Sequence, residues 1–293
     1  MKRFKSIAAV LAAGAAIFVG AFAGCATPDE EKEAMTPQTE YTEDYPDIPS
    51  DENIQTEIQP GEPEKPEAEI PKESETPKEP TQKTVTYLQV TAEGVNIRSG
   101  AGTSYSVRGT AEKSTLYALD ATTNGWYKTA WRNQSGYIST KYCQTVHMRA
   151  STNVQIEAVV EEGLKLLGTP YVYGAVRYMD SNGKKLSGFT TNAFDCSSLM
   201  QYIFYKGAGK VLDVNTRTQV KQGKTVKRAD LQRGDILFFT NASRKNLSGI
   251  ERIGHVALYL GDNYILHTAS DYAKIEQISA TRWGYFIQGQ RIL

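Results

Sequence analysis

The 293-residue chain has few cysteines, few histidines and only one long apolar run, and each shortage excludes a class of protein. Three cysteines are too few for the disulfide framework of a small secreted domain. A single apolar run excludes a membrane protein with several spanning helices. No CxxC or HExxH spacing occurs in the sequence, so a zinc site fits it poorly.

Acidic and basic residues balance at 33 each, but they are unevenly distributed. Residues 28–80 contain 18 acidic residues, 4 lysines and 10 of the 11 prolines, whereas residues 81–293 carry 26 bases and 15 acids. Like charges repel and prolines extend the chain, so we expect residues 25–83 to form a disordered tether. A binding tail is the alternative to a plain spacer. The remainder is long enough for one or two domains.

The N-terminus has the pattern of a targeting signal. Three basic residues precede an apolar run over residues 7–23, so residues 1–24 are predicted to be a signal peptide. The segment 21–25 (AFAGC) resembles the lipobox of bacterial lipoproteins, which implies lipidation of Cys25 and a membrane anchor facing the cell wall. The same residues contain an A-x-A cleavage site, which would release a soluble secreted protein. A retained membrane helix is a third alternative, for which the run is short.

Residues 84–147 predict a small all-β barrel, because short runs rich in Val, Tyr and Thr alternate with turn signals. Three motifs resemble those of the bacterial SH3-like domain: 94–100 (GVNIRSG), 125–128 (GWYK) and 135–139 (SGYIS). The resemblance implies binding of cell-wall peptides. Trp126, Tyr127 and Tyr137 could serve that binding or could simply pack the barrel. Cys143 is most simply a small buried hydrophobic residue.

Residues 151–293 predict a domain of a different class. Apolar residues at helical spacing indicate a helix over 153–167, with Gly168 as its C-cap, and a second helix over 197–205. Four strands are predicted after the helices: 235–240, 254–260, 264–268 and 284–288. Helices first and antiparallel strands afterwards are typical of the α+β class.

Cys196 is a candidate nucleophile in this domain. Asp195 precedes it and is a plausible N-cap for the second helix. The positive end of a helix dipole favours the thiolate, which is the form that attacks. A buried structural thiol is the alternative interpretation.

Two of the chain's three histidines, His255 and His267, lie in neighbouring predicted strands. A three-residue loop between the strands would pair Leu260 with Tyr264 and place both histidines on one face as diagonal neighbours. A two-residue loop would place them on opposite faces, because side chains alternate along a strand. With the longer loop one histidine can orient the other, whereas two unrelated strand histidines remain the alternative.

Five motifs follow one another in this half of the chain: 168–174 (GTPYVYG), 194–198 (FDCSS), 233–239 (RGDILFF), 254–261 (GHVALYLG) and 266–267 (LH). In this order they resemble the NlpC family of papain-like cell-wall cysteine peptidases. The resemblance covers nearly all of residues 151–293. It implies that Cys196 is the nucleophile, His255 the general base and then acid, and His267 the orienting residue. Tyr171 matches a tyrosine that helps to stabilise the oxyanion, with core packing as its alternative role.

The resemblance also implies that Asp195 and Ser197 contact the free amine end of the stem peptide, although Asp195 could be a helix cap only. Gln219 fits a family pattern without an assigned role. Two features depart from the family. The segment 174–194 is longer than the segment that usually separates these two motifs in the family. It either borders the site or forms a plain surface insertion. Val214 stands where the family often has arginine.

The function that the resemblance implies is hydrolysis of peptidoglycan stem peptides at the bond between γ-D-glutamate and the diamino acid. It implies no metal, no organic cofactor and no nucleic-acid partner. One rival is a non-catalytic lipoprotein that binds the cell wall through its SH3-like barrel. The other is the same chemistry on another cell-wall amide, or acyl transfer.

Overall fold

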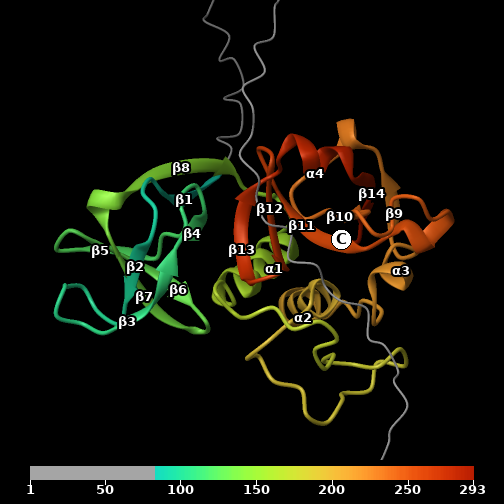
Figure 1. The fold of residues 1–293 in the computed structure, drawn as a ribbon, viewed down its shortest axis with the longest axis horizontal. Helices are drawn as coiled ribbons and strands as arrows, with labels where there is room; N and C mark the ends of the chain where they lie inside the picture. The colour runs from blue at the N-terminus through green and yellow to red at the C-terminus, as the bar shows by residue number, and fades with distance from the viewer. Residues whose placement is uncertain (1–82) are drawn as a thin grey trace, which may run out of the picture. The chain divides into compact units, whose positions relative to one another are not determined.

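The computed structural model describes residues 83–293, which fall within one compact unit by their contacts (Figure 1). The predicted signal peptide, Cys25 and nearly all of the predicted tether lie outside the described residues. Within residues 83–293 none of the helices has the length and apolar character needed to cross a membrane.

The first part of the described chain is built from eight strands, as predicted for an all-β unit. A five-stranded sheet has the order β3-β2-β7-β6-β5, and a second ladder has the order β8-β1-β4. The strands are β1 (Thr84–Val90), β2 (Val95–Arg98), β3 (Val107–Ala111), β4 (Leu116–Ala118), β5 (Ala121–Thr123), β6 (Trp126–Trp131), β7 (Gln134–Ser139) and β8 (Cys143–Arg149).

Two helices open the second part. Helix α1 (Val154–Lys165) begins at the N-cap Asn153, whose side chain accepts a hydrogen bond from the Gln155 N–H. The expected C-cap at Gly168 is wrong, because the helix ends at Lys165 and Leu166 is its C-cap. Gly168 follows two residues later with a φ of +83°, a conformation that glycine adopts without steric cost.

Helix α2 (Cys196–Ala208) starts as the sequence predicts. The Asp195 carboxylate accepts a hydrogen bond from the Ser198 N–H, and the Ser198 hydroxyl accepts one from the Asp195 N–H. This capping box satisfies N–H groups that the first turn of a helix leaves unpaired. The inward side chains Leu199, Ile203 and Phe204 are fully buried. The cap therefore fixes the point at which Cys196 enters the helix.

The sheet of the second part has the order β13-β12-β11-β10-β14-β9 and continues through β13 into β4. Its strands are β9 (Lys224–Val226), β10 (Ile236–Phe239), β11 (His255–Gly261), β12 (Tyr264–Ala269), β13 (Tyr272–Gln277) and β14 (Phe286–Arg291). The short helices are α3 (Thr216–Gln219) and α4 (Ala280–Gly284). Helices combined with an antiparallel sheet confirm the predicted α+β class. Strands β9 and β13 were not predicted.

The hairpin of β11 and β12 corrects one expectation and confirms another. Its turn consists of two residues, Asp262 and Asn263, both with positive φ, rather than the expected three. An extra residue in β11, Leu260, forms a bulge that compensates for the shorter turn. Leu258 therefore still faces Leu266, which is the predicted register.

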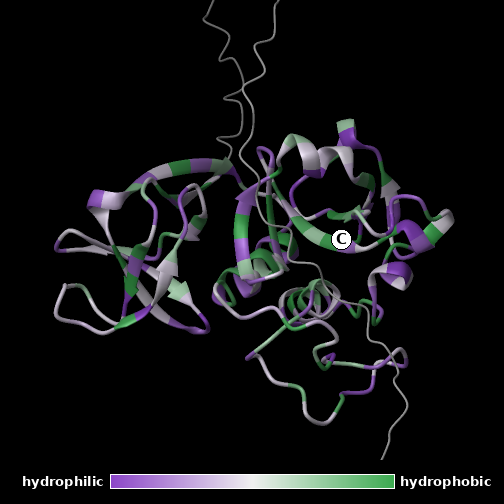
Figure 2. Cartoon of the chain, in the orientation of Figure 1, coloured by the Kyte–Doolittle hydropathy of each residue, from purple (hydrophilic) through white to green (hydrophobic). Residues whose placement is uncertain are grey.

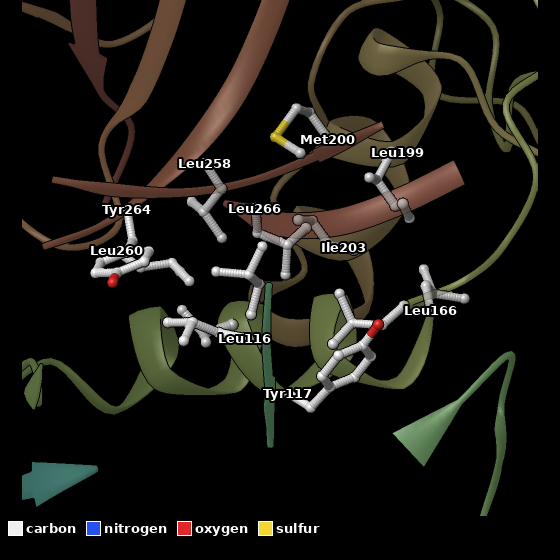
Figure 3. Close-up of a cluster of buried hydrophobic side chains, with 14 of the residues drawn as sticks. Leu116, Tyr117, Leu166, Leu199, Met200, Ile203, Leu258, Leu260, Tyr264 and Leu266 are labelled. Atoms are coloured by element: carbon white, nitrogen blue, oxygen red, sulfur yellow. The ribbon is translucent and has the colours of Figure 1, made fainter. Parts of the chain in front are cut away.

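A shared core holds helix α2 against the sheet (Figure 3). Leu199 and Ile203 of α2 pack with Leu258 of β11 and Leu266 of β12, and Leu116 of β4 joins the same cluster. Figure 2 shows green, hydrophobic stretches along α2 and β11. Because apolar burial is the dominant stabilising force, this core fixes the start of α2 against β11.

Residues 174–194, drawn in yellow beside α2 in Figure 1, are anchored on that helix. The backbone N–H and C=O of Met179 both hydrogen-bond to the buried Gln201 side chain, at 3.0 and 3.2 Å. The Tyr178 ring packs against the rings of Phe189 and Tyr202. The tip of the segment is exposed, as the sequence predicts, but its base is part of the packed structure.

Candidate active site

Cys196 is the first residue of α2 and lies against the start of β11. Its side chain is nearly enclosed, since the residue is 8% exposed. Backbone N–H groups of Val256 and Ser197 hydrogen-bond to the sulfur. Because Val256 directly follows His255, the thiol lies beside the strand that carries the first histidine. The structure thus brings the two predicted residues to one place.

The helix start favours the thiolate, as predicted, because the Ser197 N–H lowers the pKa of the Cys196 thiol, but burial outweighs this effect. Burial raises the pKa of the Cys196 thiol to about 12, and the Asp195 carboxylate raises it further. The two backbone N–H groups and the Arg177 guanidinium act in the opposite direction but do not outweigh burial. Cys196 therefore rests as a thiol and needs a base to remove its proton.

His255 and His267 lie on the same face of the sheet, as the predicted register requires. The distance between His255 Nε2 and His267 Nδ1 is 2.9 Å, which is a hydrogen bond. The two rings meet at 78° with centroids 5.1 Å apart. His267 is completely buried, whereas His255 is partly exposed. The buried ring can therefore orient the more accessible one.

A third group, Glu276 on β13, was missed by the sequence analysis. Its Oε1 lies 3.1 Å from His267 Nε2, although this contact does not reach ideal hydrogen-bond geometry. Arg282 Nη2 donates to the same Oε1 at 2.7 Å. Burial alone would raise the pKa of Glu276, but the contacts with His267, Arg282 and Lys274 outweigh it and hold the pKa at about 2. Glu276 is therefore an anion at neutral pH.

The chain of contacts assigns the protons on both imidazoles. A carboxylate accepts but does not donate, so Glu276 favours a proton on His267 Nε2. His267 Nδ1 is then an acceptor, and His255 Nε2 is the donor in their 2.9 Å bond. The remaining nitrogen of neutral His255, Nδ1, is left as an acceptor. His255 is thus prepared to receive a proton.

Both histidines are kept neutral by their surroundings. Burial lowers the pKa of His255 well below its usual value, and the nearby His267 and Arg282 lower it further. Burial also lowers the pKa of His267, and the contact with Glu276 only partly offsets this effect. A neutral imidazole next to a neutral thiol is the resting state suited to general-base catalysis.

Asp195 and Ser197, the predicted substrate-binding residues, are both engaged by another side chain. Arg177 Nη2 lies 2.7 Å from Asp195 Oδ2 and 3.2 Å from Ser197 Oγ. Asp195 is 4% exposed and caps α2, which confirms its predicted role as a helix cap, whereas its contact with the amine end of the stem peptide stays a prediction. Arg177 comes from residues 174–194 and carried no signal in the sequence.

Three further predicted positions lie around the start of α2. Tyr171 forms an isolated bridge with Phe194, two residues before the nucleophile. The buried Gln219 side chain donates to the carbonyls of Ser197 and Asp213, at 2.9 and 2.8 Å, so its role is to hold the first turn of α2. The Val214 carbonyl accepts from Arg177 Nε at 2.8 Å.

Within residues 83–293, no group of three or more His, Cys, Asp or Glu side chains is arranged to hold a metal ion. On the SH3-like part, a groove of about 510 Å³ lies between loops and strands of the barrel. Its lining includes Trp126, Arg98, Lys141 and Tyr142.

Comparisons with known proteins agree with the two-part organisation. Residues 168–291 match the NlpC/P60 family, and residues 93–144 match the bacterial SH3 domain. The gamma-D-glutamyl-L-lysine dipeptidyl-peptidase of Bacillus subtilis is 29% identical over 171 residues, which cover 58% of this chain and 50% of the relative. The peptidoglycan endopeptidase RipA of Mycolicibacterium smegmatis is 34% identical over 112 residues, which cover 38% of this chain and 20% of the relative.

The chain therefore spans about half the length of the first relative and about a fifth of the second. Among solved structures, an NlpC/P60 family protein from Bacillus cereus is 19% identical with a TM-score of 0.38, covering 71% of this chain and 64% of its own. The order of the motifs and the placement of Cys196, His255 and His267 agree with the two family matches. Residues 168–291 are an NlpC/P60 domain by family match, and they follow a bacterial SH3 domain at residues 93–144.

Proposed function

We propose that this protein is a cysteine peptidase that cleaves peptidoglycan stem peptides between γ-D-glutamate and the diamino acid. The observation that carries the proposal is the placement of the Cys196 thiol against Val256, the residue after His255, together with the contacts that link His255 to His267 and His267 to the Glu276 carboxylate. This is the nucleophile, base and orienting group that acyl transfer requires. The names of the two relatives, one a dipeptidyl-peptidase and one a peptidoglycan endopeptidase, support the same bond class.

In the proposed reaction, His255 Nδ1 takes the proton from Cys196 as the sulfur attacks the γ-carbonyl carbon. The backbone N–H of Cys196 is the first of α2 and has no acceptor within the helix, so it can stabilise the oxyanion. Tyr171 matches the tyrosine that assists this stabilisation in the family. His255 then protonates the departing amine of the diamino acid, which leaves a γ-D-glutamyl thioester. Water, deprotonated by His255, attacks the thioester and restores the thiol.

The hydrogen bond between the histidines supports each step. The imidazolium that forms on His255 would be unfavourable in a buried site without a partner. The hydrogen bond to His267, which in turn contacts the anionic Glu276, stabilises this positive charge. The same two contacts hold the His255 ring in one orientation throughout the catalytic cycle.

The test is digestion of defined muropeptides by the purified full chain, read by mass spectrometry. We expect two products, one ending in γ-D-glutamate and one beginning with the diamino acid. Cleavage at the muramoyl–alanine bond, or products of acyl transfer to an amine, would replace the proposed bond with one of the alternatives. Cleavage of no stem peptide would contradict the enzymatic function.

A second candidate function, binding to the cell wall, is supported by the groove on the SH3-like part. Trp126 and Tyr142 offer aromatic faces there, and Arg98 and Lys141 offer cations that complement the carboxylates of stem peptides. Retention of the chain on purified walls tests this function. We expect Trp126→Ala to reduce retention, and unchanged retention would contradict binding at the groove.

A further inference from the structure

One side chain of the segment 174–194, the cationic Arg177, lies at the start of α2, the helix that carries the nucleophile. The guanidinium contacts the residues on both sides of Cys196, namely Asp195 at 2.7 Å and Ser197 at 3.2 Å. The positive charge of Arg177 lowers the pKa of the Cys196 thiol, although burial outweighs this effect. The segment therefore borders the site, which decides between the two interpretations that the sequence left open.

Most donors of Arg177 are already used. The Nε–H donates to the Val214 carbonyl, and one Nη1–H donates to the Ala175 carbonyl at 2.7 Å. Both Nη2–H groups are directed to Asp195 and Ser197. A guanidinium has five N–H groups, so one Nη1–H remains available for an acceptor outside these four.

The ion pair presents its cationic member to solvent. The Arg177 side chain is 21% exposed, whereas that of Asp195 is 5% exposed. The Asp195 carboxylate also accepts from the Ser198 N–H at 2.8 Å and from the Ser197 hydroxyl at 3.0 Å, so nearly all of its acceptor capacity is filled. An ammonium group of a substrate that approached Asp195 would meet the guanidinium first and be repelled by it.

Arg177 is not needed to attach its own segment. The hydrogen bonds between Met179 and Gln201 and the packing of Tyr178 on Tyr202 hold residues 174–194 on α2 independently of the guanidinium. A positive charge placed beside the nucleophile, partly exposed and with a free donor, is the arrangement of a residue that binds an anion.

We propose that Arg177 binds the free α-carboxylate of the D-glutamyl residue whose γ-carbonyl is attacked by Cys196. This inference rests on the proposed function and names the substrate group that the site selects. A γ-linked glutamate keeps its α-carboxyl group outside the scissile bond, three carbon atoms from the γ-carbonyl carbon. The α-carboxylate therefore stays free to bind a cation beside Ser197, the residue that follows the nucleophile. The enzyme therefore prefers stem peptides with D-glutamate over those with D-isoglutamine, whose α-carboxyl group is an uncharged amide.

The test uses the full chain and two stem peptides that differ only in this group, carboxylate in one and carboxamide in the other. Both peptides carry the diamino acid that the muropeptide digestion identifies. We expect wild type to cleave the carboxylate peptide with a kcat/KM about tenfold or more higher, because a charge-assisted hydrogen bond is lost with the amide. Arg177→Gln should bring this ratio close to one, mainly by raising the KM of the carboxylate peptide. Arg177→Lys should retain a preference, because it keeps the charge.

Lys184→Gln is the matched control, since it removes an exposed positive charge from the same segment without touching Asp195. It should leave the wild-type ratio unchanged. If the wild type cleaves both peptides with equal kcat/KM, the inference is overturned. This comparison does not depend on whether any variant folds. An unchanged ratio in Arg177→Gln, or an equal loss for both peptides, also overturns it, because a structural role alone affects both peptides alike. A wild type that cleaves neither peptide instead contradicts the proposed function.

Discussion

At the scale of single residues, the site depends on a carboxylate that never approaches the substrate. Of the two histidines, Glu276 contacts only His267, and its effect passes through both imidazole rings to His255 Nδ1. The pKa of Glu276, held at about 2, keeps this carboxylate anionic at neutral pH. We therefore regard Glu276 as a positioning residue.

Glu276→Gln tests this role. The amide can present an N–H to His267 Nε2, so the proton arrangement of both rings is no longer fixed. We expect kcat for stem-peptide cleavage to fall about 10- to 100-fold, within the range of general-base contributions, with KM nearly unchanged. Glu251→Gln, which changes an exposed carboxylate, is the control. An unchanged kcat and pH profile in a folded Glu276→Gln variant would show that the carboxylate does not act on the histidines.

The candidate nucleophile and the two histidines were predictable because local patterns place them. An N-cap sequence locates Cys196 at a helix start, and alternation along strands decides which face a histidine occupies. Glu276 was missed because β13 was not assigned. Its alternation of Ala273 and Ile275 with polar neighbours is the signal that would have indicated a third strand and a diagonal neighbour of His267.

At the scale of elements, the turn of the β11–β12 hairpin is shorter than the sequence predicted, yet His255 and His267 still lie on one face of the sheet as predicted. The bulge at Leu260 adds one residue to β11, and the turn is one residue shorter than expected, so the two differences cancel. Arg177 had no comparable signal, because residues 174–194 follow no period and their contact with Asp195 arises from tertiary packing alone. The state of the thiol was likewise unpredictable, since burial decides it.

The close approach of α1 and α2 makes a prediction at this scale. A Cβ on Gly207 of α2 would overlap the α1 backbone at Val159. Glycine to alanine normally stabilises a helix, but here we expect the free energy of unfolding to fall by about 1–3 kcal/mol through overpacking. Urea denaturation measures the change. Gly284→Ala in α4, where a Cβ meets open space, is the control and should not destabilise the protein. A stabilising Gly207→Ala would contradict the packing described for the two helices.

At the scale of the whole molecule, burial of two neutral histidines links stability to pH. The unfolded chain binds protons on His255 and His267 near their usual pKa of about 6.5, whereas the folded protein resists protonation because both pKa values are lowered. Below pH 6.5 the unfolded state therefore holds more protons, and the free energy of unfolding falls as the pH falls. The depressed pKa of Glu276 acts in the same direction at lower pH, from about 4.5 down to about 2.

We expect Tm to decrease steadily between pH 7 and pH 5. His267→Gln removes one of the buried imidazoles and should flatten this decrease, whereas His147→Gln, at an exposed position, should leave it unchanged. Thermal denaturation followed by circular dichroism over this range measures both effects. A Tm that is constant from pH 7 to pH 5 in the wild type would argue that the two histidines are not buried as neutral rings.

Cys143 offers a matched comparison for the central claim, because it is the other free cysteine within residues 83–293. It lies on β8, which β1, β4 and β13 separate from the strands of His267 and His255. The most direct measurement is cleavage of one defined stem peptide by wild type, Cys196→Ala and Cys143→Ala, with the products identified by mass spectrometry. The expected result is release of the diamino acid end from γ-D-glutamate by wild type and Cys143→Ala, and none by Cys196→Ala. Cleavage by a folded Cys196→Ala protein would contradict the assignment of Cys196 as the nucleophile.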